Sequence, residues 1–114
     1  IFQYSGSSRR SSAAKGSSVY YSTKDTADFN GLTGKIMSDT FLTNLTEALG
    51  TKKMGSINHN YVVVSEENSV PAVLLELGFM SNPDELKRVV KAKYQKKAAK
   101  CIYKSVLTCF VRLR

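Results

Sequence analysis

The sequence predicts an α/β fold of the three-layer type, in which helices flank a sheet. Two patterns support this class. The run AVLLELGF at residues 72–79 is almost continuously apolar, as in a strand that is covered on both faces. Two longer segments, residues 25–49 and 94–111, repeat apolar residues at the spacing of amphipathic helices. With 114 residues, the chain is long enough for one domain only.

The composition excludes several classes of protein. Its 42% hydrophobic and 23% charged residues are typical of a globular domain, and they exclude wholesale disorder and collagen-like or mucin-like chains. No apolar run approaches the roughly 18 residues that a membrane-spanning helix needs, so we expect no membrane span. The start, IFQYSGSSRR, has neither an initiator Met nor a signal-peptide pattern, and we expect it to be a cut or processed end.

The chain is expected to divide into a short leading segment and one folded domain. Residues 1–17 are predicted to be a Ser-rich loop or frayed lead-in, because serines, glycines and an Arg-Arg pair favour turns and bury little surface. Residues 18–114 are predicted to form the domain. Its first strand is SVYYS at residues 18–22, which is β-branched and aromatic.

The first long helix is predicted from about Asp25 to Leu49, and Gly50 supplies a C-terminal stop. Gly31 and Gly34 weaken the beginning of this prediction, because each glycine inside a helix costs about 1 kcal/mol relative to alanine.

Two further strands are predicted at YVVV, residues 61–64, and at residues 72–79. The polar segment between them is too short for the helical crossover that joins parallel neighbours. These two strands therefore either pair antiparallel or lie apart in the sheet.

The last quarter of the chain is predicted to be helical. Asn82 is suited to cap a helix and Pro83 to begin it, so a short helix to about Lys91 is expected. A longer helix, from about Tyr94 to Val111, has one broad apolar face. Its opposite arc carries five lysines: Lys93, Lys96, Lys97, Lys100 and Lys104.

The net charge of +8 is concentrated in this last quarter. Residues 1–85 carry 7 basic and 9 acidic side chains, whereas residues 86–114 carry 10 basic and no acidic ones. On general grounds such a block indicates a solvated helix face. The alternative is an anionic partner, which could be nucleic acid, an acidic membrane surface or a cell-wall polymer. Lys93, Lys97 and Lys100 are the candidate polyanion-binding residues.

Cys101 and Cys109 are the two cysteines of the chain. On one helix they would be separated by a rise of roughly 12 Å, too far for a disulfide. With no C-x-x-C motif, buried apolar roles are expected for both, and the redox compartment stays open.

Glu76 is the residue that does not fit its surroundings, because it interrupts the apolar run AVLLELGF. Burying an ionised carboxylate is costly unless the group is paired, protonated or brought out at the end of the strand. A glutamate near the carboxyl end of a strand can serve as a general acid or base, whereas an ion pair with a basic residue is the structural alternative.

Three segments of the sequence are similar to a known family. The stretch VPAVLLELGFMSNPDE at residues 70–85, with KGSSVYYS at residues 15–22 and KYQKKAAKCIYKSV near the end, resembles the zinc-dependent N-acetylmuramoyl-L-alanine amidases, which are bacterial cell-wall hydrolases. The resemblance covers about residues 15–110 and only the C-terminal part of the family's domain. It implies that the leading strands of the family fold are missing and the sheet is incomplete.

The resemblance implies a role for Glu76, which matches the family's catalytic carboxylate. That group activates the attacking water beside the zinc and then protonates the leaving amine, as metal-assisted amide hydrolysis requires. The turn at Asn82 and Pro83 is implied to be structural. A binding-only role, as a zinc-free derivative or regulatory subunit, is the alternative function.

The resemblance also predicts that this chain alone holds no zinc. The family takes two ligands from its early region and a histidine from a strand that would correspond to the stretch near IFQYSGSS, which contains no histidine. That third ligand is either lost or lies just upstream of Ile1. A catalytic zinc generally needs three protein ligands.

His59, the only histidine, matches no metal-ligand position of the family. It is expected to be an ordinary turn residue, with contact to the substrate as the alternative. The partners implied are peptidoglycan or an anionic wall polymer, in an extracytoplasmic location at the cell wall. Nucleic acid is disfavoured because no known binding motif accompanies the lysines, and exposed sheet edges are expected to permit self-association.

Overall fold

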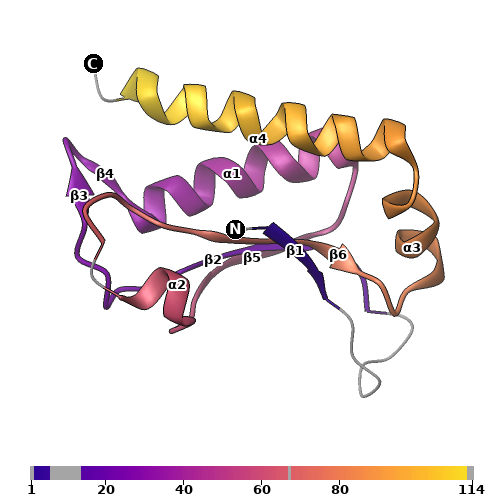
Figure 1. Ribbon diagram of the computed structural model, residues 1–114, viewed down its shortest axis with the longest axis horizontal. Coiled ribbons are helices and arrows are strands. Elements are labelled where there is room, and N and C mark those ends of the chain that lie inside the picture. The colour runs from indigo at the N-terminus through magenta and orange to yellow at the C-terminus, as the bar shows by residue number, and fades with distance from the viewer. Residues whose placement is uncertain (1, 6–13, 67, 113–114) are drawn as a thin grey trace.

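The computed structural model describes residues 2–5, 14–66 and 68–112. Over these residues the chain begins with strands, alternates between helices and strands in its middle, and ends with helices (Figure 1). The elements are β1 (Phe2–Ser5), β2 (Ser17–Tyr21), β3 (Asp28–Phe29), β4 (Leu32–Thr33), α1 (Gly34–Leu49), β5 (Lys53–Asn58), α2 (Val62–Ser65), β6 (Leu74–Phe79), α3 (Pro83–Val89) and α4 (Ala92–Arg112).

The main sheet has the strand order β1-β6-β2-β5. Strand β6 pairs parallel with β1 and antiparallel with β2, and β2 pairs parallel with β5. The sheet is therefore mixed, and within the described residues β1 and β5 are its edges. These are the two strands through which the expected self-association would occur.

The helices are distributed unequally around this sheet. Helices α1 and α4 lie side by side on one face and run in opposite directions, whereas the short α2 lies on the other side (Figure 1). Helix α3 lies beyond one end of β6. A sheet flanked by helices confirms the predicted α/β class. Within the part of the chain that the structure describes, every helix is too short or too polar to span a membrane.

The apolar core lies between the sheet and the α1–α4 pair. Strand β6 is buried along its whole length, as the apolar run predicted. Side-chain hydrogen bonds join α1 to β5 and to α4. The hydroxyls of Ser38 and Ser56 share one hydrogen bond, and the Asn44 amide donates to the hydroxyl of Ser105 of α4 at 3.0 Å. The core residues are Val19, Leu32, Phe41, Leu42, Leu45, Leu49, Val73, Leu75, Leu77, Ala98, Cys101 and Cys109.

The beginning of the chain differs from the loop that was expected for residues 1–17. Residues 2–5 form strand β1, because β6 offers them a parallel neighbour to pair with. Residues 6–13 of that expected loop lie outside the described residues. Strand β2 begins at Ser17, one residue before the predicted start.

The first long helix begins at Gly34 rather than near Asp25, so this prediction was wrong for the first third of its length. A small hairpin, β3–β4, occupies that segment, and its turn residues Asn30 and Gly31 both have positive φ, at 53° and 91°. An Asn-Gly pair favours this kind of turn. Thr33 then caps α1 by accepting from the N–H of Ile36.

The strand predicted at residues 61–64 was also wrong. This segment forms the short helix α2 at Val62–Ser65, and the second long edge of the sheet is instead β5, Lys53–Asn58. Among the described strands, β5 pairs with β2 alone. It is partly exposed along its length, so it lacks the apolar pattern of a buried strand.

The predicted helix end at Gly50 and the predicted helix start at Asn82 and Pro83 are confirmed. Gly50 ends α1 with φ 64°, the left-handed conformation that glycine adopts easily. The Asn82 side chain caps α3 by accepting from the N–H groups of Asp84 and Glu85, with Pro83 as the first helical residue. Helix α4 buries Ala98, Cys101 and Cys109 on one face.

Candidate active site

Glu76 lies in the middle of β6, on the sheet face opposite to α1 and α4. Its neighbours Leu75 and Leu77 belong to the core beneath these helices, and successive side chains of a strand point to opposite faces. The side chain is only 6% exposed. The carboxylate is therefore held within a buried strand, rather than being brought out at the strand's end.

The hydroxyl of Tyr20 donates a long hydrogen bond of 3.4 Å to Oε2 of Glu76. The strand register explains this contact. Ser18 of β2 lies opposite Glu76, and Tyr20 is two residues further along on the same face. Burial raises the pKa of Tyr20, against a lowering effect of its hydrogen bond with Ser18, and the charge of Glu76 raises it further. Tyr20 is thus held as a protonated donor toward the carboxylate.

His59 and Tyr61 extend this contact into an aromatic cluster with Tyr20. The ring centroids of His59 and Tyr61 are 4.3 Å apart, and those of Tyr61 and Tyr20 are 5.1 Å apart, both edge-to-face. The backbone N–H of His59 donates to the carbonyl of Tyr21, which fixes the segment after β5 against β2. His59 itself is exposed.

The structure therefore brings together two residues that the sequence singled out separately. Glu76 and His59 are both neighbours of Tyr20, at 3.4 Å between oxygens and 6.2 Å between ring centroids respectively. Chemically, the cluster combines a buried carboxylate, a phenol that donates a hydrogen bond to it, and an exposed imidazole ring that can contact a ligand.

Sequence reasoning missed Tyr20 and Tyr61. The strand SVYYS contained a signal for Tyr20, because neighbouring residues of a strand face opposite sides of the sheet. Since Tyr21 packs against the core, Tyr20 must lie on the other face, where Glu76 also lies. No such signal existed for Tyr61, since its position depends on α2 forming where a strand was expected.

Glu85 is a second buried carboxylate, at 5% exposure, and its role is structural. It accepts hydrogen bonds from the backbone N–H of Gly16, at 2.6 Å, and from that of Phe79. These contacts join α3 to β2 and β6. The sequence did not predict this role, because the partners of Glu85 lie 6 and 69 residues away in the chain.

The described residues do not fit a complete zinc site. Among residues 2–5, 14–66 and 68–112, no group of three or more His, Cys, Asp or Glu side chains could hold a metal ion. Cys101 and Cys109 are both buried on α4, as expected for apolar roles. No chemical step is therefore assigned to a metal held by these residues.

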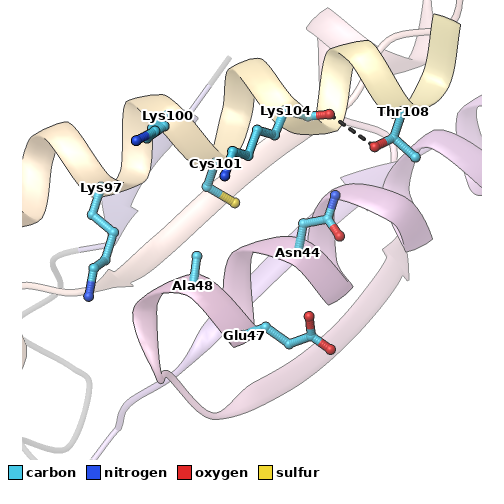
Figure 2. A pocket seen from close by; sticks show the side chains of 8 residues that line it. All are labelled: Asn44, Glu47, Ala48, Lys97, Lys100, Cys101, Lys104 and Thr108. Carbon is cyan, nitrogen blue, oxygen red and sulfur yellow. Dashed lines mark hydrogen bonds between the residues drawn. The ribbon is translucent and has the colours of Figure 1, made fainter. Parts of the chain in front are cut away.

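The candidate polyanion-binding residues lie elsewhere. Lys93, Lys97 and Lys100 are exposed on α4, on the side of the sheet that carries the two long helices. A cavity of about 490 Å³ there is lined by residues of both α4 and α1 (Figure 2). Its lining comprises Asn44, Glu47, Ala48, Lys97, Lys100, Cys101, Lys104 and Thr108. The sheet thus divides the predicted site residues into two separate places.

Comparison with known proteins gives a consistent family. Residues 6–108 match the family model described as N-acetylmuramoyl-L-alanine amidase. A germination-specific N-acetylmuramoyl-L-alanine amidase of Bacillus subtilis (strain 168) is 36% identical over 81 residues, which are 71% of this chain and 32% of the relative.

Solved amidase structures share the fold. The N-acetylmuramoyl-L-alanine amidase from Clostridium difficile 630 is 27% identical with a TM-score of 0.78, covering 92% of this chain and 53% of the other. The catalytic domain of CwlV from Bacillus (Paenibacillus) polymyxa var. colistinus is 26% identical with a TM-score of 0.77, and the match covers 97% of this chain and 55% of the CwlV chain. The chain thus spans about a third of the curated relative and about half of each solved amidase chain.

Proposed function

Since this chain belongs to the N-acetylmuramoyl-L-alanine amidase family, we propose that it is the C-terminal part of a peptidoglycan amidase domain. In the intact enzyme, this domain hydrolyses the amide between the muramic lactyl group and L-alanine. The polymer substrate implies action outside the cytoplasm, at the cell wall.

Glu76 is the proposed catalytic residue, and the observation that carries the proposal is the place of its carboxylate. The group is buried in β6, on the face away from α1 and α4, with the Tyr20 hydroxyl directed at Oε2. Glu76 accepts a proton from the attacking water as the new C–O bond forms at the scissile carbonyl. It then donates that proton to the amide nitrogen as the C–N bond breaks, so the residue ends unchanged.

Tyr20 is proposed to act as a positioning residue for Glu76. Its phenol is a donor with a raised pKa, so it remains protonated throughout the neutral range and can hold one carboxylate oxygen in place. His59 and Tyr61 are proposed to contact the substrate through their adjacent rings, His59 being exposed beside the cluster. This is the substrate-binding role considered for His59 from the sequence.

The zinc of this zinc-dependent family needs ligands other than those described here. The described residues provide no cluster of three metal-binding side chains, whereas a catalytic zinc site generally uses three. We propose that Glu76 works in a domain whose ligands lie outside the described residues, and that the 114-residue chain by itself binds no zinc in stoichiometric amount.

The experiment is Glu76→Gln in the full-length enzyme, with turnover measured on a soluble muropeptide. We expect hydrolysis to be abolished, while circular dichroism and zinc content stay those of the parent. Glu66→Gln, at an exposed glutamate after α2, is the matched control and should retain turnover. Retained turnover in the Glu76 variant would show that this carboxylate is only structural.

A binding-only function is the second candidate, and the exposed lysines of α4 favour it, because they suit an anionic wall polymer. Such a protein would bind the wall without cleaving it, as a zinc-free derivative or a regulatory subunit. Metal analysis of the full-length protein distinguishes the candidates, because one zinc per full-length chain would contradict the binding-only function.

A further inference from the structure

The cavity between α1 and α4 forms a groove that is lined by basic, acidic and neutral polar side chains. Figure 2 shows the lysines projecting from α4, with Asn44, Glu47 and Ala48 on the facing α1. Three lysines line the cavity against the one carboxylate of Glu47. Asn44 and Thr108 add neutral polar groups, and the cavity of about 490 Å³ is large enough for several anionic groups of a chain-like ligand.

The lysines of α4 are not neutralised by described neighbours. Among the described residues the ion pair that forms is Lys35 with Asp39, both on α1. Helix α4 has no acidic residue among its 21, and its lysines repeat at positions four apart, as in Lys93–Lys97 and Lys100–Lys104. Like charges at this spacing repel and destabilise a helix. An ordinary solvated helix face carries both signs, so this face is suited to an anion supplied from outside.

The groove lies on the opposite side of the sheet from Glu76. Glu76 faces away from α1 and α4, whereas Lys97, Lys100 and Lys104 stand on the outer helix of that pair. A ligand held in the groove therefore cannot present its reacting bond to Glu76 of the same chain. The groove is therefore separate from the face of the sheet on which Glu76 lies.

We propose that this groove binds the phosphodiester groups of an anionic, flexible polymer of the cell wall. The ammonium groups of Lys97, Lys100 and Lys104 contact successive phosphates, and Lys93 extends the positive track along the same helix. Residues 100 and 104 are separated by a rise of about 6 Å along the helix, so their ammonium groups can contact neighbouring phosphates of one polymer chain. Lysine is a compact point charge, which suits phosphates in variable orientations.

The residues of the groove favour such a polymer over single-stranded nucleic acid. Nucleic-acid grooves combine positive charge with aromatic rings on which bases stack. The lining of this groove contains no aromatic side chain: it consists of Asn44, Glu47, Ala48, Lys97, Lys100, Cys101, Lys104 and Thr108. Binding is expected to depend on charge alone.

The test measures binding of the full chain to lipid-free poly(glycerol phosphate) across a series of salt concentrations. The variant combines Lys97→Glu, Lys100→Glu and Lys104→Glu. We expect at least a tenfold loss of affinity at low salt. The slope of log affinity against log salt should fall by about two, as expected for three lost phosphate contacts on a flexible strand.

The matched control combines Lys24→Glu, Lys52→Glu and Lys87→Glu, which changes the net charge equally at exposed lysines on other elements. It should keep most of the affinity. Equal losses in both variants would overturn the proposal, because net charge alone would then explain binding. Tighter binding of single-stranded DNA than of poly(glycerol phosphate) with equal charge would also overturn it. Circular dichroism shows whether both variants are folded.

Discussion

The carboxylate of Glu85 lies 2.6 Å from the backbone nitrogen of Gly16 and accepts its hydrogen bond across 69 residues of sequence. The same carboxylate accepts from the N–H of Phe79, at the end of β6. One buried side chain thus connects α3 with the beginning of β2 and the end of the strand that carries Glu76.

Replacing Glu85 by Ala should destabilise the chain by about 3 kcal/mol, because two buried N–H groups lose a charged acceptor. Glu85→Gln should lose less, since its carbonyl oxygen still accepts. Urea unfolding followed by circular dichroism measures both. Asp84→Ala, one residue earlier and exposed, is the control and should lose about 0.5 kcal/mol or less. Equal losses at positions 84 and 85 would contradict the connecting role.

Replacing Gly16 by Ala should also destabilise the chain, for two reasons that can be separated. Gly16 has φ +118°, and an added Cβ would lie 2.7 Å from both the Lys52 carbonyl oxygen and Met54 Cγ. Gly31 has φ +91° with open space around it, so Gly31→Ala reports the backbone strain alone. We expect Gly31→Ala to cost about 1 kcal/mol and Gly16→Ala to cost clearly more. A smaller loss at Gly16 would contradict the steric argument.

Replacing Asn82 by Ala should remove the cap of α3. The Asn82 side-chain oxygen accepts from the N–H of Asp84 at 3.0 Å and from that of Glu85 at 3.3 Å. Loss of such a cap typically costs about 1 kcal/mol, and Asn82→Asp, which keeps an acceptor, should remain near the parent. Thermal unfolding of the two variants gives the comparison. Similar melting temperatures for both would show that the cap contributes little.

Tyr20 should ionise at higher pH than an ordinary tyrosine. Burial is the main cause of its raised pKa, and the charge of Glu76 contributes. The folded state therefore favours the protonated phenol, so this contribution to stability is full below about pH 10 and is lost as the pH rises through the folded pKa. Phenolate absorbance, with Tyr20→Phe subtracted, gives the midpoint. Glu76→Gln should lower that midpoint, and an unchanged midpoint would show that the carboxylate does not influence Tyr20.

Both cysteines should resist thiol reagents in the folded chain. Burial raises the pKa of Cys101, against lowering effects of Ser105 and Lys104, so little of the reactive thiolate forms near neutral pH. Cys109 is buried on the same helix at 4% exposure. Labelling with a chromogenic disulfide should be slow in buffer and complete in urea, with two thiols per chain. Fast native labelling would contradict the packing of α4 against α1.

Local sequence patterns predicted some elements correctly because their causes are local. Asn82, followed by Pro83 and two acidic residues, satisfies the free N–H groups at a helix start, and these groups lie within a few residues. The Asn30-Gly31 pair was an equally local signal for the β3–β4 hairpin. It was outweighed by the helical spacing of neighbouring apolar residues, which extended the predicted helix too far.

Other predictions failed because the deciding partner is far away in the sequence. Residues 61–64 have the composition of a strand, yet the place beside β2 is taken by β5 on one side and β6 on the other. Strand β5 has a weak pattern and forms because β2 pairs with it. The expected apolar face of α4 is likewise only partly buried, since Phe110 stays 59% exposed.

The sequence by itself determined the α/β class, the buried strand around Glu76, the cap at Asn82 and the cationic face of α4. Each follows from side chains within one turn or one strand, where periodicity and capping act directly. Only the tertiary structure decided that Tyr20 and His59 neighbour each other, that Tyr20 contacts Glu76, and that the lysines lie on the other side of the sheet. Strand order and register bring residues into contact that are tens of positions apart in the sequence. A local pattern does not specify which distant strand will be the neighbour.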